Sequence, residues 1–553
     1  VPNPRRTVPL NGLAAMRRIF IGVVLALCFQ ATMVNAATAD TEYVSLLQLF
    51  EDFREQFRIT DRATYLATVS ERSVKMEFEE LLNFEQRLAA FKDHDWPVSR
   101  QVDLRLIRAE MNGLRFAHTV TRPWSTDPGY YADFVREIGY GHRFPLSSRA
   151  LADFSRHLKA IGPIFANARD NLSDVETIPR DLATLAVRDL SESREQLEYL
   201  ATRLSKYHPE ILTDVQQAAR HTEEFSAWLE SHRADMNGVA GVGRENYNWL
   251  LEHVYLIPYS IDELRLMVEL EDNRVITFQR LEQVRNAHLP QLQPVSSQEE
   301  YRESVYASIE HLMNFIKHRK LFSMPDYLVP GNYPGSWHGF DRSWPEKHDY
   351  FFNFSHRESL MEEAHEMVGH HFDELRADRH PHPVRHGWRP HKISTARAEG
   401  FAFAIEELFM HAGYLDHRSP RTREVAYEQA AFRTVRAMAD LRMHNLEWDL
   451  EHAMDYAVAN APHGKLLEGS DHLWFEMGTT LRGTGHHMLM VIGKVQFMKL
   501  FRDYAHAKGD DFQIKEFLDR FFASGVIPFS LIRMEMLGSL VPDQQFTTSE
   551  RDY

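Results

Sequence analysis

Cysteine is almost absent from this sequence, and its only copy, Cys28, lies close to the N-terminus. The chain after residue 36 therefore contains no thiol, which excludes thiolate zinc sites and a cysteine nucleophile from that part. A chain without cysteine also suits an oxidising compartment such as the periplasm.

Positive charge is scarce as well. The sequence holds 63 Lys and Arg against 79 Asp and Glu, and its formal net charge is −16 at pH 7. Nucleic acids and anionic membranes attract proteins through Lys and Arg. We therefore expect neither nucleic acid nor an anionic membrane surface as a partner.

The apolar run at Ile19–Phe29 is too short to span a bilayer comfortably, because a span needs about 20 apolar residues. Arg17 and Arg18 precede this run, and Val34–Ala36 forms a small-x-small cleavage site. Together these parts predict a secretory signal peptide over residues 1–36. The expected protein is periplasmic or secreted and has no integral membrane segment after cleavage.

Two details of this segment leave alternatives open. Met16 stands where such a signal would start, so one interpretation places residues 1–15 upstream of the true start, as a mistranslation. Cys28 is also a candidate lipoprotein acceptor, but Leu27 precedes it where a small residue is wanted. We therefore favour a cleaved signal peptide.

A Gly/Ser/Pro-rich linker is also missing, which favours lobes folded against one another. Apolar residues recur at intervals of three and four from Tyr43 to about His118, and again from Ser147 to about Arg233, so the fold class predicted is mainly α. Gly238–Gly243 marks a boundary. We expect an N-terminal helical lobe over 37–240 and a catalytic lobe over 241–553.

Three irregular stretches interrupt the helical pattern. Arg122–Val135 is interpreted as an ordered connection packed on the core, with a substrate-contacting loop as the alternative. The stretch Met324–Ser355 either covers the core or lines a cleft, and within it Asp349–Phe354 is the candidate for a small strand beside the active-site helix. Arg379–Lys392 holds four histidines and three prolines, and polar loop groups are favoured over metal ligands there.

The motif most informative about chemistry lies in Ser355–Leu375. Ser355 and Glu358 have the spacing of a capping box, which predicts that a helix begins here. Within it, HEMVGHH is close to the H-E-x-x-H pattern of zinc hydrolases, but His370 follows His365 by five residues and not four. On a regular helix a residue five along points about 140° away from the first.

Gly369 offers a way to bring these two histidines together. Glycine adopts irregular backbone readily, and a single π-type turn there would swing His370 back into line with His365. His371 is the rival to His370, since adjacent helical residues point about 100° apart and only one should reach the ion. Zinc sites for hydrolysis use three protein ligands. Glu399, at the start of an apolar and small helical run, is the best third ligand.

These motifs resemble a known family. HEMVGHH followed by EGFAFAIEEL resembles the HExxPGHH and EGWALYAE signatures of the bacterial domain of unknown function 885 family, whose members resemble thermolysin-like zinc metallopeptidases. The C-terminal blocks GHHMLMVIGKVQFMKLFRDYA and FQIKEFLDRFFASGVIPFSLI are similar as well, as is ENYNWLLEHVYLIPYS. The resemblance implies a multi-helical two-lobed fold around a deep cleft.

The sequence departs from the family pattern in two blocks. The spacing between His365 and His370 is one residue shorter than usual, and Val368 replaces a proline. Farther on, His486 replaces a glutamine and Met490 a tyrosine. If that tyrosine binds an oxyanion in the family, the replacement is sought among His486, His487 and Arg482.

We therefore predict that His365, His370 and Glu399 bind Zn²⁺ and that Glu366 is the general base that activates water. His486 and His487 are the candidate oxyanion donors. The expected substrate is a short peptide or a related amide.

Two other classes remain open for this sequence. One is a catalytically silent relative that binds a metal or a peptide, and the other is a histidine-rich metal buffer with several weak sites. A helix rich in Glu and His that forms only a solvated face is the structural alternative.

Overall fold

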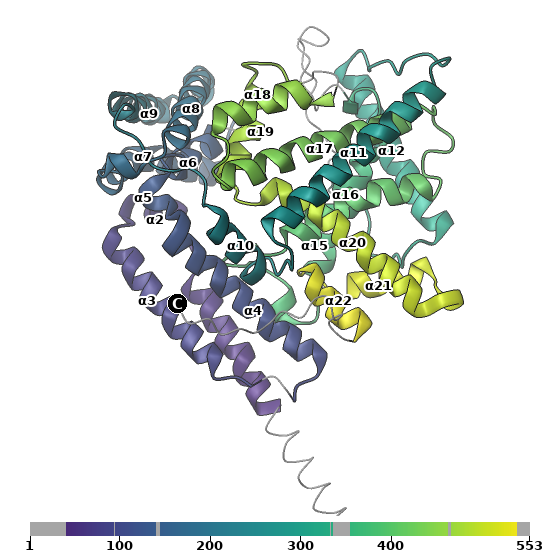
Figure 1. Ribbon diagram of the computed structural model, residues 1–553. Helices are drawn as coiled ribbons and strands as arrows, with labels where there is room; N and C mark the ends of the chain where they lie inside the picture. Colours follow the sequence, from purple (N-terminus) through teal and green to yellow (C-terminus); the bar gives the residue numbers. More distant parts are fainter. Residues whose placement is uncertain are drawn as a thin grey trace, which may run out of the picture.

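The computed structural model is helical throughout (Figure 1) and describes residues 40–92, 95–139, 144–331, 333, 335, 354–462 and 466–538. Within these ranges there is no β-strand, and Pro179 and Gly238 form an isolated parallel bridge. The predicted mainly α fold class is therefore confirmed. The strand predicted at Asp349–Phe354 lies, except for Phe354, outside the described residues.

The N-terminal half forms a series of helices joined by short turns. These are a helix over residues 40–56, α2 (Arg62–Thr68), α3 (Glu71–Ala89), α4 (Val98–Phe116), the π-helix η1 (Ala117–Thr121), α5 (Pro123–Thr126), α6 (Gly129–Gly139), α7 (Ser148–Asn171), η2 (Val175–Thr177), α8 (Arg180–Tyr207), η3 (Pro209–Ile211) and α9 (Leu212–His232).

The C-terminal half continues in the same way. Its helices are α10 (Arg244–His253), α11 (Ile261–Arg285), α12 (Gln298–Arg319), α14 (Leu360–Glu363), the π-helix η4 (Ala364–His371), α15 (Phe372–Ala377), η5 (Pro383–Arg385), α16 (Thr395–His411), α17 (Thr422–His444), α18 (Leu450–Asn460), α19 (Asp471–Arg482), α20 (His486–Lys508), η7 (Gly509–Asp511), α21 (Ile514–Ala523) and α22 (Phe529–Leu537).

Two apolar cores organise these helices. The small core is formed by α2 and α6 to α9, which lie together at the upper left of Figure 1. The large core joins the helix over 40–56, α3 and α4 to helices of the C-terminal half. The helix over 40–56 and α4, with most of the buried side chains of α3, therefore pack with the C-terminal half, whereas α2 packs in the small core. The segment predicted as one lobe, 37–240, is thus divided between the two cores.

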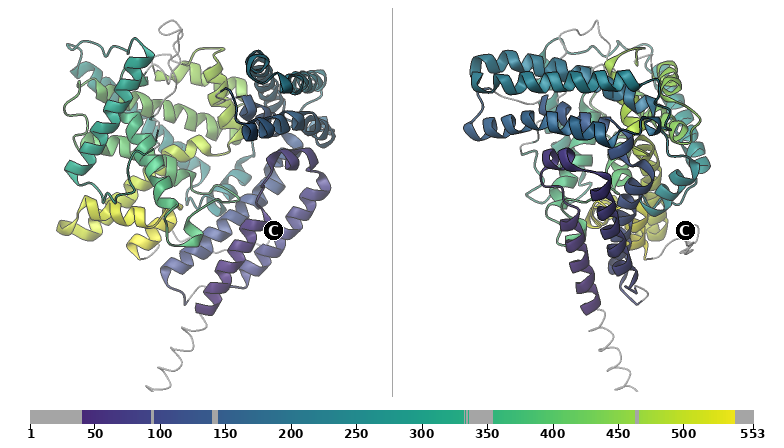
Figure 2. Two further views of the ribbon diagram at one scale, coloured as in Figure 1. Left: turned by 180° about the vertical axis from the view of Figure 1, so that it is seen from behind. Right: turned by 90° about the vertical axis from the view of Figure 1, so that its left-hand side faces the viewer.

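A third apolar cluster joins the two halves. Leu182 and Leu185 of α8 pack with side chains of α17, α18 and α19, including Leu473 and Met477. Seen from the side in Figure 2, the bundle of α7 to α9 extends along the top of the molecule and α3 and α4 run down from it. The N-terminal helices thus contact the C-terminal half along two separate surfaces.

Two helix starts were predicted from capping boxes in the sequence. The capping box of Ser260 and Glu263 is present at the start of α11 and confirms that prediction. The box predicted at Ser355 and Glu358 is wrong, because α14 begins only at Leu360, whose amide donates to the Glu358 carboxylate. That carboxylate also accepts from the Thr422 hydroxyl, so it serves a tertiary contact.

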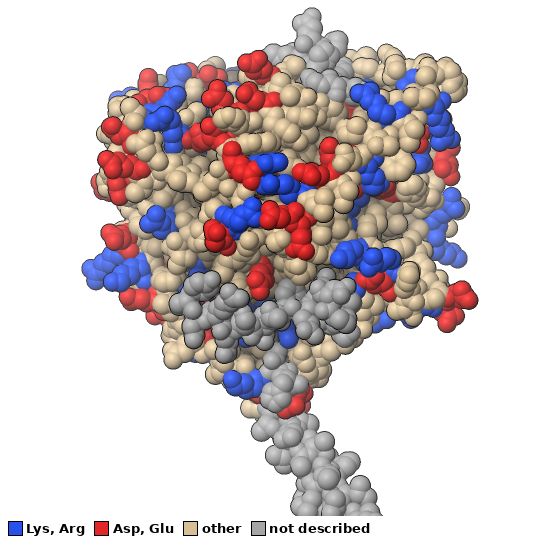
Figure 3. Space-filling view, in the orientation of Figure 1, with Lys and Arg blue, Asp and Glu red and all other residues tan. Residues whose placement is uncertain are grey.

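The distribution of surface charge and the length and polarity of the helices are relevant to possible partners. Acidic and basic side chains are interspersed over the face shown in Figure 3. Within the described part of the chain, every helix is too short or too polar to cross a bilayer.

Candidate metal centre

The centre is built on the π-helix η4 (Ala364–His371), which contains the wide turn predicted at Gly369. The turn places the Nε2 atoms of His365 and His370 only 3.2 Å apart. Gly369 faces α16 so closely that a Cβ on it would lie 2.3 Å from the Ala402 Cβ. The glycine therefore permits both the wide turn and the close approach of α16.

Glu399 reaches the same point from the second turn of α16. Its Oε2 lies 3.8 Å from His365 Nε2 and 3.7 Å from His370 Nε2. Gly400 allows α16 to pack closely on α20, because a Cβ on it would lie only 2.3 Å from the Cα of Gly493 in α20. Within the described residues, this is the one group of three or more His, Cys, Asp or Glu side chains that could hold a metal ion.

The spacing fits a tetrahedral zinc ion. Two nitrogens bound to one such ion at about 2.0–2.1 Å lie roughly 3.3 Å apart, close to the separation of the two imidazoles. Glu399 needs a shift of a few tenths of an ångström to join them. The side chains of His370 and Glu399 are 23% and 22% exposed, so the group is open to solvent on one side.

A buried carboxylate orients His365. The Nδ1 atom of His365 lies 2.7 Å from Oε1 of Glu406, and the Arg433 guanidinium lies 2.7 Å from the same oxygen. Burial and the Arg433 charge lower the pKa of His365 to about 3, so the ring is neutral at pH 7. In the tautomer with the proton on Nδ1, that proton is donated to Glu406. The lone pair of Nε2 then faces His370 and Glu399, as a metal ligand requires.

Nearby positive groups favour the ionised forms of Glu399 and Glu406. Burial raises the pKa of Glu399, but His370 and His365 outweigh it and bring the pKa below its ordinary value. Burial raises the pKa of Glu406 to about 7, and Arg433 opposes this rise. Arg433 therefore places a positive charge next to Glu406, the carboxylate that contacts His365.

Glu366 and His371 each follow one of the two candidate histidine ligands on the same π-helix. Glu366 is partly buried and its charge acts on both His365 and Tyr333. His371 stacks on the Tyr333 ring at a centroid distance of 5.3 Å and lies outside the convergent group. The placement favours His370 over its rival His371 as the ligand.

Three residues near the centre were not predicted from the sequence. Glu406 lies seven residues after Glu399 on the same face of α16, and this spacing could have identified it. Arg433 lies in a helix interpreted as core, and Tyr333 lies in the long connection, so neither carried a signal. The Tyr333 hydroxyl donates to Glu363 at 3.0 Å.

The structure separates the two candidate oxyanion donors at the start of α20. The charges of His486 and Glu399 act on one another, and burial lowers the pKa of His486. His487 is buried elsewhere, with its Nδ1 2.5 Å from the Thr480 hydroxyl and its Nε2 3.7 Å from Glu476. His486 is therefore better placed than His487.

The two other positions singled out in that region have structural partners. Arg482 donates to Asp189 at 2.7 Å and lies 3.6 Å from Asp127, so it is engaged between α19 and the small-core helices. Met490 accepts a contact from Arg436 at 3.8 Å. Arg482 is therefore not a free substitute for the tyrosine of the family pattern.

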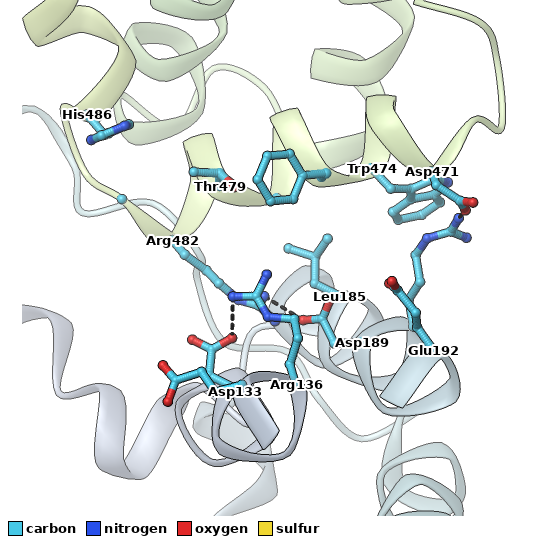
Figure 4. A pocket seen from close by; sticks show the side chains of 15 residues that line it. Asp133, Arg136, Leu185, Asp189, Glu192, Asp471, Trp474, Thr479, Arg482 and His486 are labelled. Carbon is cyan, nitrogen blue, oxygen red and sulfur yellow. Dashed lines mark hydrogen bonds and ion pairs between the residues drawn. The ribbon is translucent and has the colours of Figure 1, made fainter. Parts of the chain in front are cut away.

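A cavity of about 660 Å³ lies between helices of the N-terminal half and α19 (Figure 4). It is walled by α6 and α8 below and by α19 above, and His486 stands at its edge. Its floor is strongly charged, with Arg136 and Arg482 paired to Asp133 and Asp189. The cavity and the metal group therefore share His486 as their common neighbour.

The class of the protein follows from these features: it is a helical protein in which two histidines of a π-helix and a glutamate of α16 form a His₂Glu group. Residues 332–536 match the family model described as bacterial protein of unknown function, DUF885. The family resemblance is therefore confirmed over this segment, which contains every residue of the candidate centre.

Two solved structures share the fold. One is a presumed lipoprotein of unknown function from Shewanella oneidensis, with a TM-score of 0.65, 15% identity and coverage of 90% of this chain and 98% of that one. The other is a presumed lipoprotein from Colwellia psychrerythraea, with a TM-score of 0.67, 12% identity and coverage of 90% and 99%. No curated protein matches the chain.

Proposed function

We propose that the protein is a periplasmic or secreted zinc-dependent hydrolase that cleaves short peptides or related amides. The observation that carries the proposal is the convergence of His365, His370 and Glu399 beside Glu366. The presumed lipoproteins that share the fold support a location outside the cytoplasm.

Each side chain has a role in this reaction. Zinc, when bound, supplies a Lewis acid and lowers the pKa of a coordinated water toward about 7. Glu366 takes the proton of the attacking water and passes it to the leaving amine. The neutral imidazole of His486 donates its one N–H to the oxygen on which negative charge develops.

A catalytically silent relative that binds metal or peptide is the second candidate. Met490 favours it, because the side chain that stands in place of the family's tyrosine has no hydroxyl. The Met490 sulfur contacts Arg436 instead. A histidine-rich metal buffer has less support, because the histidines of Arg379–Lys392 lie outside the convergent group.

The variant Glu366→Gln distinguishes the two candidates. Metal content is measured by mass spectrometry, and cleavage is measured on a library of short peptides and acyl amides. We expect about one zinc per chain in parent and variant, and a loss of about 10²–10⁴-fold in kcat in the variant, the range for a general base.

The control is Glu374→Gln, an exposed carboxylate in α15, which should retain parent activity. Zinc without cleavage of any substrate by the parent chain would favour the silent relative. Equal activity of Glu366→Gln and the parent would refute the role of Glu366.

A further inference from the structure

A second cavity, of about 530 Å³, lies away from the metal centre, and none of the centre's residues line it. It forms where α2, α3, α4 and α5 meet the end of the helix over 40–56, and these helices lie close together in Figure 1. Five of its lining residues have large aromatic side chains: Phe57, Tyr65, Trp124, Tyr130 and Trp388. Pockets of this size and lining are typical of small-molecule sites.

The cavity lies between the two apolar cores. Phe57 and Leu114 pack on the large core, whereas Tyr65, Trp124 and Tyr130 pack on the small core. Its rim carries the irregular backbone of the π-helix η1 and of the residue that follows it, Arg122, which has a φ of 41°. Irregular backbone of both kinds is concentrated at functional sites.

One acidic group in the wall lacks a counter-ion. The carboxylate of Glu77 hydrogen-bonds with Tyr65, and burial raises its pKa. No Lys or Arg of the described chain pairs with it or shifts its pKa. The other acid, Asp61, caps α2 and pairs with Arg156 at 3.3 Å. Glu77 is therefore a partly buried negative charge faced by phenol rings.

Little positive charge opposes a cation in this pocket. Arg58 is the sole Lys or Arg in the described lining; it lies 3.8 Å from Glu55 and its guanidinium lies 5.7 Å from the centre of the Trp388 ring. Burial lowers the pKa of His391 to about 4 and also lowers the pKa of His118. Both histidines are therefore neutral at pH 7.

Two nitrogens in the wall have no hydrogen-bond partner. These are the indole Nε1 of Trp124 and Nε2 of His391, both shielded from solvent. A buried polar atom without a partner is costly, and a polar ligand in the pocket would satisfy it. The lining therefore combines aromatic faces, one uncompensated carboxylate and two free polar atoms.

We propose that this pocket binds a small organic ammonium ion that carries an oxygen atom, with its cationic group among the aromatic rings and Glu77 as its counter-charge. Aromatic faces attract ammonium groups through their quadrupoles, most strongly when both are desolvated. The site is independent of the metal centre and of the proposed hydrolysis.

Calorimetric titration of the full mature chain with choline tests the proposal. The comparison ligand is 3,3-dimethylbutan-1-ol, which has the same shape and hydroxyl but no charge. We expect choline to bind about tenfold or more tightly than the uncharged alcohol, because only the cation gains from the rings and the carboxylate. Equal affinities, or no binding of choline at millimolar concentration, would overturn it.

Two variants locate the binding. Glu77→Gln keeps the shape but removes the charge and should weaken choline binding about tenfold while leaving the alcohol unaffected. Glu79→Gln, an exposed carboxylate on the same helix, should bind choline like the parent. Thermal unfolding of both variants checks the fold. A third variant, Tyr65→Phe, removes the hydroxyl that contacts Glu77 and gives a second measure of the site. Binding of glucose in place of choline would assign the pocket to a neutral sugar and refute the proposal.

Discussion

Two histidine-rich regions lie close together in the sequence and differ completely in structure. In the first, His365 and His370 point their Nε2 atoms at one another across a π-turn. In the second, Arg379–Lys392, His380 contacts the Ala523 carbonyl at 3.2 Å and His382 lies 3.4 Å from Asp103. The first region converges on a point, whereas the second fastens a loop to its neighbours.

The difference shows that histidine content alone does not make a metal site. The second region holds four histidines against three in His365–His371, but prolines spread them along an irregular backbone, where they contact separate neighbours. The geometry of the first region comes from Gly369, from the close packing of α16 against it and from the buried carboxylate of Glu406. Convergence of lone pairs is therefore the feature that metal binding should follow.

Substitution of Glu399 should separate the two regions most sharply. We expect Glu399→Ala to weaken zinc binding by more than about 100-fold and abolish hydrolysis, since even the loss of an outer partner costs about 10–100-fold. Competitive titration with a fluorescent zinc chelator measures the affinity. The matched variant His382→Asn should keep parent affinity; the reverse result would transfer the metal site to the loop.

Substitution of Glu406 sharpens the comparison by testing what orients the ligand. Glu406→Gln should weaken zinc binding by about 10–100-fold, because His365 Nδ1 and Arg433 both lose the carboxylate that they share. Zinc titration measures the change. Glu424→Gln, which breaks the 3.1 Å pair with Arg421 elsewhere, should lower stability without altering zinc affinity. Equal effects on zinc would mean that Glu406 acts only on the fold.

Much of this site could be predicted from the sequence, because its geometry depends on local rules. The five-residue interval between His365 and His370 required a wide turn, and Gly369 was the residue able to provide it. Glu399 was identifiable as a lone acid opening an apolar helix. The predicted helical fold class followed in the same way from intervals of three and four residues.

The tertiary partners could not be predicted. Glu358 follows the capping pattern, but its carboxylate binds Leu360 and Thr422, and no local rule gives the second contact. The helix over 40–56, α3 and α4 are ordinary amphipathic helices, and nothing in their pattern shows that they pack on the C-terminal half while α2 packs in the small core. Arg482 was a candidate for chemistry from its sequence position alone, whereas its contacts with Asp127 and Asp189 give it a structural role.

The smallest expected effect tests the turn on which the comparison depends. Gly369→Ala places a methyl group against both the side chain and the backbone of Ala402, with its carbon 2.7 Å from the Ala402 Cα, so the backbone must move. Overpacking of this kind costs about 1–3 kcal/mol in the free energy of unfolding. Removal of the Ala402 methyl cannot relieve it, since the clash with the Ala402 backbone remains. Chemical denaturation should show this loss together with weaker zinc binding.

The control for this variant is a glycine that meets a movable side chain. At Gly478, also within a helix, a Cβ would lie 2.8 Å from a Leu185 methyl, which can rotate away. Gly478→Ala should therefore cost less stability than Gly369→Ala and leave zinc affinity at the parent value. If Gly369→Ala also kept full zinc affinity, the alignment of His365 with His370 would not depend on the glycine, and a regular helix with shifted side chains would have to explain their convergence.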